Sequence, residues 1–188
     1  MRTAKPQSLA ILDEGRLELL DYDGLLQFQQ GSAVWGATVV FRALQRAAPC
    51  LSVSSLWDRR SLMVTSAHPG PGVRDAFEYV TRCVSRGRYR LTHPQQEGQC
   101  HKDMQFAWWI DDGARTVSVS LRAGFVPAEF FVLVDRIETP MEQPGDQKQL
   151  EQLKAELTKK VLVESLDDLF HVTVSPHQIE KSELTCMN

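Results

Sequence analysis

The sequence predicts an α+β fold in which helices pack against a mainly antiparallel sheet. Several segments carry apolar residues at helical spacing, and others alternate apolar and polar residues as half-buried strands do. The turn at 111–113 joins two strand candidates as a hairpin. With 188 residues and 43% hydrophobic side chains, the chain can bury one core, and it shows no internal repeat. Helices beside hairpin-linked strands are typical of the α+β class.

The first third of the chain predicts two helices and two strands. Residues 9–26 fit a helix loosely, whereas residues 32–48 carry apolar side chains at regular helical spacing and end before a proline. We expect Gly36 to mark the close approach of another backbone, because a glycine inside a helix otherwise costs about 1 kcal/mol. The alternation over 50–56 and the β-prone run over 62–67 predict strands.

The middle of the chain predicts a helix followed by a sheet. The turn at 68–72 contains two glycines and two prolines, and a helix restarts at Val73 and closes at Gly87. Trp108 and Trp109 are adjacent on a predicted strand, so we expect their side chains on opposite faces, one of them in the core. The three strands expected here are residues 89–92, 104–110 and 116–122.

The last part of the chain predicts two helices, a short strand and a tail. One helix is expected over 127–137, and the clearest amphipathic pattern of the chain covers 147–163. Residues 172–174 predict a strand, and the last dozen residues predict a tail. We therefore expect an α+β core over residues 1–140, with the amphipathic helix and tail of residues 141–188 packed on it.

Composition and charge argue against several classes of protein. The net charge of −3 is opposite in sign to that of most nucleic-acid binders. No apolar stretch approaches the roughly 20 residues that cross a bilayer, and no apolar signal core follows Met1, so we expect a cytoplasmic protein without a membrane partner. The cysteines have no CxxC spacing, which predicts free thiols; they are Cys50, Cys83, Cys100 and Cys186.

The turn between the strand at 62–67 and the next helix is the first candidate site. Backbone N–H groups at the start of a helix favour an anion, and Gly70 and Gly72 let a backbone approach a ligand closely. His68 adds an imidazole that can act as a metal ligand or as an acid–base group. The alternative is a stiff strand-to-helix connection that His68 caps.

Two sets of side chains are candidate metal ligands. His68 and Cys83 form a pair suited to zinc or another late transition metal, while the alternative for Cys83 is a buried thiol that acts as a small hydrophobe. Cys100 and His101, with His93 nearby, form a weaker set that lacks the closed four-ligand pattern of a structural zinc site.

A cluster of arginines is the candidate anion site. Arg82 and Arg86 belong to five arginines between residues 74 and 90 of an otherwise acidic chain, and guanidinium groups bind carboxylates and phosphates. We therefore expect Gly70, Gly72, Arg82 and Arg86 to bind a small anionic ligand, and we assign no catalytic residue. The alternative is a solvated face on which these arginines pair with local acids.

One segment resembles a known family. Residues 75–91 read DAFEYVTRCVSRGRYRL, which is similar to the stretch D-A-I-Q-x-x-T-G-C-T-x-G-K-G-x-L of the FmdE family, named after a component of formylmethanofuran dehydrogenase. Asp75, Thr81 and Cys83 match its Asp, Thr and Cys, and residues 86–88 lie near its G-K-G. The resemblance implies an α+β core, often dimeric, in proteins linked to molybdenum or tungsten C1 metabolism.

The chain departs from this family at the metal ligands. The His and Cys residues of the family's N-terminal F-H-G-H-x-C-P-G motif are absent, Gly72 replaces a further Cys, and the C-terminal zinc finger of some members is missing. The resemblance therefore implies a divergent, homodimeric accessory protein that binds a metal ion such as zinc, or a small anionic ligand, near His68 and Cys83. Two alternatives stay open: an enzyme for an anionic substrate with His68 as acid or base, and a purely structural homodimeric module.

Overall fold

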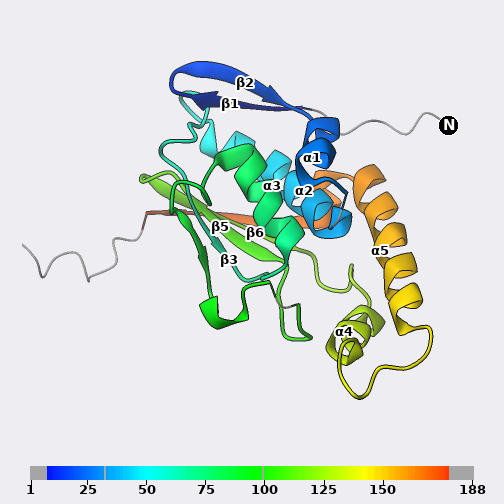
Figure 1. Ribbon diagram of the computed structural model, residues 1–188. Helices are drawn as coiled ribbons and strands as arrows, with labels where there is room; N and C mark the ends of the chain where they lie inside the picture. Colours follow the sequence, from blue (N-terminus) through cyan, green and yellow to red (C-terminus); the bar gives the residue numbers. More distant parts are fainter. Residues whose placement is uncertain (1–7, 32, 99, 178–188) are drawn as a thin grey trace, which may run out of the picture.

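The computed structural model describes residues 8–31, 33–98 and 100–177, and it has the predicted α+β fold (Figure 1). One sheet has the strand order β4-β3-β5-β6-β7, and β1 and β2 form a separate hairpin. Neighbouring strands are antiparallel except for β3 and β4, which are parallel. The strands are β1 (Leu9–Asp13), β2 (Arg16–Leu20), β3 (Met63–Ser66), β4 (Tyr89–Leu91), β5 (Ala107–Asp111), β6 (Arg115–Leu121) and β7 (Phe170–Pro176).

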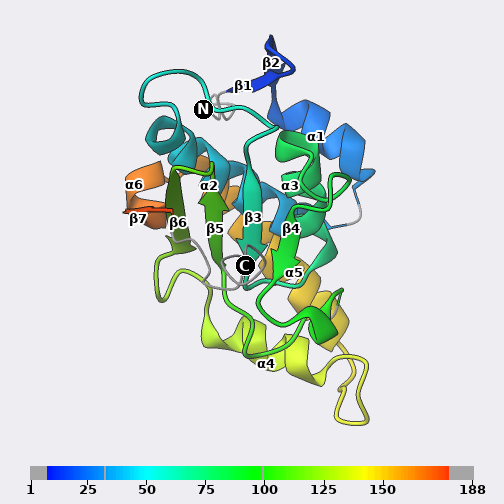
Figure 2. The same cartoon turned by 90° about the vertical axis from the view of Figure 1, so that its left-hand side faces the viewer.

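The main helices cover one face of the five-stranded sheet. In Figure 2 the strands β3 to β6 face the viewer and the long helix α2 lies behind them. This helix packs against β6, β7, α3 and α5, so it forms the centre of the core. The helices are α1 (Tyr22–Gln29), α2 (Val34–Leu51), α3 (Pro71–Thr81), α4 (Ala128–Arg136), α5 (Asp146–Val163) and α6 (Leu166–Leu169), with a 3₁₀ turn at Pro94–Gln96.

Alternation along the strands divides the sheet into a buried face and an open face. The buried side chains that face the helices include Val64, Trp108, Ile110, Val117 and Val119. Trp109 points to the opposite face and is half-buried. The expectation that the paired tryptophans lie on opposite faces is therefore confirmed.

The predicted helix over residues 9–26 is wrong over most of its length. A β-hairpin occupies its first part, and only the end belongs to α1. Glu14 and Gly15 have φ values of 55° and 76°, which reverse the chain between β1 and β2. Leu9 and Ile11 are buried at strand spacing, which explains why the leucines fitted a helical period only loosely.

The predicted strand over residues 50–56 is also wrong. The helix α2 continues through Pro49 to Leu51, and a loop follows. A proline near the end of a helix removes only one backbone hydrogen bond, so the helix need not stop before it. The helix predicted from Val73 to Gly87 ends already at Thr81, because Arg82 takes a left-handed conformation with φ of 57°, and Arg86 lies in the turn that follows. The remaining predicted strands and helices are present, with shifts of a few residues at their ends.

The C-terminal part of the chain completes the sheet instead of only packing on it. Strand β7 pairs with β6 over seven consecutive residues, so residues 141–188 supply the fifth strand of the core that we expected within residues 1–140. The predicted tail lies outside the described residues apart from His177, as does Cys186. No described helix has the length and apolar character needed to cross a membrane.

Candidate functional site

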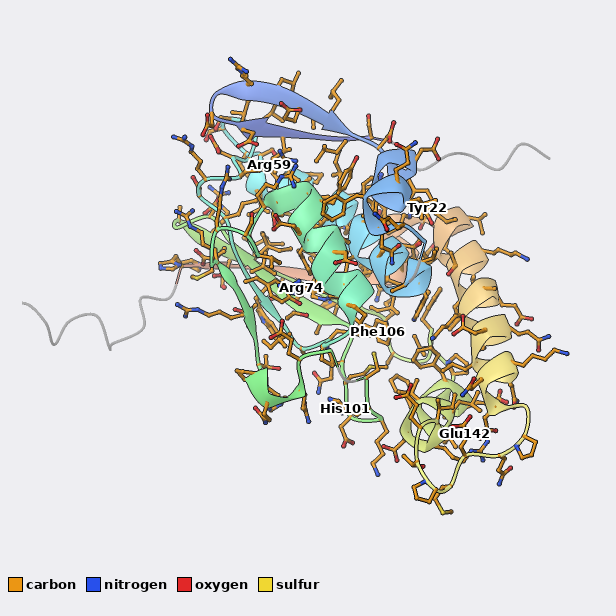
Figure 3. All side chains as sticks on the ribbon, in the orientation of Figure 1. Tyr22, Arg59, Arg74, His101, Phe106 and Glu142 are labelled. Atoms are coloured by element: carbon orange, nitrogen blue, oxygen red, sulfur yellow. The ribbon has the colours of Figure 1, made fainter. Side chains whose placement is uncertain are left out.

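The predicted site residues lie at the two ends of α3 rather than together. This helix has 11 residues and is therefore about 16 Å long. Figure 3 shows Phe106 near one end of α3 and Arg59 at the other. His68, Gly70 and Gly72 are at the N-terminal end, and Arg82, Cys83 and Arg86 are at the C-terminal end. The fold therefore does not bring His68 and Cys83 together as metal ligands, and it separates the two glycines from the two arginines.

Cys83 is a buried thiol that contacts the neighbouring backbone. Its side chain is fully buried, and Sγ donates to the carbonyl oxygen of Leu62 at 3.4 Å. Burial raises the pKa of the Cys83 thiol, which disfavours the thiolate that binds metals or attacks electrophiles. The geometry therefore fits the alternative in which Cys83 acts as a small hydrophobe.

The arginines at this end of α3 pair with acids and helix carbonyls. Arg82 lies 3.9 Å from Glu78, and Arg86 donates to Asp13 at 3.0 Å. Asp13 also accepts from Arg59, whose buried guanidinium donates to the carbonyl oxygens of residues 79 and 80. These contacts join β1 to the end of α3, so Arg86 has a structural partner where we expected a ligand.

The two glycines of the predicted binding turn make room for protein atoms. A Cβ on Gly72 would overlap the carbonyl oxygen of Ala33 and lie 2.9 Å from the Ala33 Cβ. A Cβ on Gly36 would lie 3.3 Å from the backbone nitrogen of Val73, which confirms the predicted close approach at Gly36. A Cβ on Gly70 would lie 2.8 Å from Cε1 of His68. Gly36 and Gly72 therefore serve the packing of the start of α3 against α2, whereas Gly70 makes room for the His68 ring and the Cys100 sulfur.

Local hydrogen bonds hold His68 in one orientation. Ser66 Oγ accepts from the His68 N–H at 3.1 Å and donates to the His68 carbonyl at 2.9 Å. The Gly70 N–H donates to Nδ1 of His68 at 3.0 Å. Because Nδ1 accepts, the neutral ring carries its proton on Nε2, which then has no lone pair for a metal ion.

The imidazole of His68 stays neutral throughout the physiological pH range. Burial, with a smaller contribution from His101, lowers the pKa of His68 from 6.5 to about 3. An acid–base catalyst works best with a pKa near the operating pH. The geometry therefore supports neither of the roles that we expected for His68, metal ligand or acid–base group.

Phe106 is the centre of an aromatic cluster that includes His68. The Phe106 ring lies 4.6 Å from the His68 ring, measured between centroids. Four other rings lie within 6.5 Å of it. We call this group the Phe106 cluster; its members are Trp35 from α2, His68, Phe106, Trp108 from β5, and Phe130 and Phe131 from α4.

Three rings of the Phe106 cluster carry buried N–H donors without an acceptor. Trp35, His68 and Trp108 are only 5%, 3% and 1% exposed, and their ring N–H groups have no partner within the described part of the chain. By contrast, the Trp57 indole donates to the Ala10 carbonyl at 2.6 Å. An unsatisfied buried donor costs about 1–3 kcal/mol, so buried groups of this kind normally have a partner.

The loop at 92–106 covers His68. Its backbone N–H groups at 92, 98 and 105 donate to the carbonyls of Ser66, Pro69 and Ala67. Cys100 is exposed, but its Sγ lies close to Gly70, only 3.1 Å from the position that a Cβ on this glycine would take. Two exposed ion pairs tie the loop to the helices, Arg74–Glu97 at 3.3 Å and Lys102–Asp135 at 3.5 Å. Exposed pairs of this kind contribute roughly 0–1 kcal/mol, so they do not lock the loop in place.

The described residues do not assemble a metal site. No group of three or more His, Cys, Asp or Glu side chains among them is placed to hold an ion. At Gly72, where the FmdE family carries a Cys, the carbonyl of Ala33 leaves no room for a Cβ. The described residues therefore do not fit the metal expected from the resemblance.

Comparison with known proteins adds no assignment. No protein-family model and no curated protein sequence matches this chain.

Sequence reasoning located His68 but missed its partners. Trp35, Phe106 and Phe130 lie on three separate elements, and their spacing in the sequence does not indicate that they meet. The one signal in the sequence was the number of aromatic residues, which packing into a core explains equally well.

Proposed function

We propose that this protein binds a small molecule through an oxygen acceptor, a carbonyl or carboxylate group, at the Phe106 cluster. The observation that carries the proposal is the set of three buried ring N–H donors that have no acceptor within the described residues. All three rings contact Phe106, so their N–H groups belong to one aromatic environment.

The chemistry of the cluster selects the kind of ligand. Indole N–H groups only donate, and His68 offers only the Nε2–H because Nδ1 is occupied by Gly70. A ligand group with oxygen acceptors and no donors matches this set. The surrounding rings favour an apolar or aromatic remainder, and the N-terminus of α3 beside His68 favours a partial or full negative charge.

The loop at 92–106 supplies the entry route in this proposal. Its ion pairs at Arg74 and Lys102 are weak, so moving residues 93–98 and 100–103 away from His68 mainly breaks the hydrogen bond from the Gly98 N–H to the Pro69 carbonyl, while Phe106 stays in place. Bound ligand would then supply the acceptor that the ring N–H groups lack. This is a binding function without a catalytic group, and the link to C1 metabolism rests on the FmdE resemblance alone and stays a prediction.

Ligand screening with matched compounds tests the proposal. A panel of small aromatic and aliphatic carboxylates, amides and ketones is compared, by ligand-observed NMR, with hydrocarbons of the same shape that lack the oxygen. We expect hits only among compounds with the acceptor, and a loss of affinity of about ten-fold or more in Trp35→Phe and in His68→Asn. Trp57→Phe is the matched control, because its indole already has an acceptor. Binding that ignores the acceptor, or that survives both variants, would refute the proposal.

A further inference from the structure

The two edges of the five-stranded sheet differ sharply. Strand β4 forms one edge of the sheet; it has three residues and contains Arg90, and Arg88 lies just before the strand. Strand β7 forms the other edge; it has seven residues and contains no Asp, Glu, Lys or Arg. Short length and charge are the usual protections against pairing with another chain, and β7 has neither.

The backbone of β7 presents regular hydrogen-bonding groups at its free edge. The Arg122 N–H donates to the Leu169 carbonyl at 2.8 Å, and the His177 N–H donates to the Ala114 carbonyl at 3.0 Å. The pairing with β6 continues without a bulge between these points. Because the direction of backbone groups alternates along a strand, residues 171, 173 and 175 also face β6. The N–H and C=O groups of Val172 and Val174 therefore point away from the sheet.

We propose that β7 pairs antiparallel with β7 of a second copy of this chain, with Thr173 on the two-fold axis. This register aligns the whole strand, because Phe170 then lies opposite the partner's Pro176. Val172 and the partner's Val174 exchange two hydrogen bonds, and the symmetric pair exchanges two more. Pro176 ends the pairing because it has no N–H to donate, and the Phe170 N–H opposite it already donates to the Leu166 carbonyl.

The side chains of β7 are self-complementary in this register. Thr173 meets the partner's Thr173, and valines meet valines, which are favourable cross-strand pairs. No like charges face each other, because the strand has none. Thr173 is exposed and lies on the open face of the sheet, opposite Ser118 of β6. The two sheets then form one continuous sheet of ten strands. This dimer is independent of the ligand proposed for the Phe106 cluster.

Charge variants on the two-fold axis test this interface with the full-length chain. Thr173→Lys or Thr173→Glu alone places two like charges directly opposite each other, and we expect the dimer dissociation constant to rise at least about ten-fold. An equimolar mixture of the two variants places opposite charges together and should restore the dimer. Ser118→Lys, one strand further in on the same face, is the control and should leave dimerisation unchanged.

Sedimentation velocity across the micromolar range measures the outcome, with circular dichroism to confirm that each variant is folded. A dimer of the natural chain that is lost in each single variant and recovered in the mixture supports the proposal. A natural chain that stays monomeric, a dimer that tolerates Thr173→Lys, or a mixture that fails to recover it would each overturn the proposed interface.

Discussion

The burial of His68 predicts a measurable dependence of stability on pH. The pKa of His68 falls to about 3 in the folded protein, whereas in the unfolded chain it returns to its ordinary value of 6.5. Between these two values the unfolded state binds one more proton than the folded state, so stability falls as the pH falls through this window. Above pH 6.5 both states are neutral at this residue, and it makes no pH-dependent contribution there.

The size of the effect follows from the width of this window. Each pH unit below 6.5 costs about 1.4 kcal/mol, so at pH 5 the protein loses about 2 kcal/mol through His68. His68→Asn removes the titrating ring and retains an oxygen that can accept from the Gly70 N–H. We therefore expect the variant to lose about 2 kcal/mol less than the natural protein between pH 7 and pH 5.

Urea unfolding followed by tryptophan fluorescence at several pH values gives these free energies. The carboxyl groups of Asp13, Asp111 and Asp146 have lowered pKa values, so their stabilisation is lost only below their ordinary value of 3.8. Burial raises the pKa of Asp75, and His177 pairs with Asp111. The His68 contribution is therefore the difference between the natural protein and His68→Asn above about pH 4.5, not the slope of either protein alone. His93→Asn, at an exposed position, is the control and should follow the natural protein. Equal pH slopes for the natural protein and His68→Asn would refute the reasoning.

Three further predictions concern packing, a buried guanidinium and thiol access. Gly72→Ala should lower the free energy of unfolding by about 1–3 kcal/mol in urea titrations, because its Cβ overlaps backbone of α2. Arg59→Met should cost about 3 kcal/mol or more by the same measurement, because it leaves helix carbonyls and a carboxylate without their donor. Arg60→Met, which breaks only an exposed ion pair, should destabilise the protein far less than Arg59→Met, and equal losses would contradict the assignment. Iodoacetamide should modify the exposed Cys100 in the native protein, but slowly, because burial of its sulfur raises the pKa of the Cys100 thiol; Cys83 should stay unmodified until unfolding, as peptide mass spectrometry can verify.

The sequence predicts correctly those helices and strands that bury one face, because their apolar residues then recur at helical or strand spacing. The stripe of α5 and the alternation of β6 indicate the correct structures because each packs one face against the core. The helix predicted over residues 9–26 is wrong because the leucines of this segment belong to two strands and a helix that follow one another. The end of α2 misleads because Pro49 lies in its last turn, where the loss of one hydrogen bond is tolerated.

The candidate site is predicted only in part for a similar reason. Sequence reasoning identifies His68 and the glycine turn because they are neighbours in the chain. It also groups Cys83 with His68, although α3 separates the two by its whole length. A helix rises about 1.5 Å per residue, so the helix predicted between the two residues already implies that they lie far apart. The meeting of Trp35 with Phe106 depends on the packing of α2 on the sheet, which no local pattern specifies.

The indole N–H resonances of the protein test the central claim most directly. A ¹H–¹⁵N spectrum is recorded while an acceptor ligand from the screen is added. We predict that the N–H signals of Trp35 and Trp108 move downfield as they gain a hydrogen bond, while that of Trp57, already bonded to Ala10, stays in place. If the Trp35 and Trp108 signals do not move on saturation, or move no more than that of Trp57, the Phe106 cluster is not the binding site.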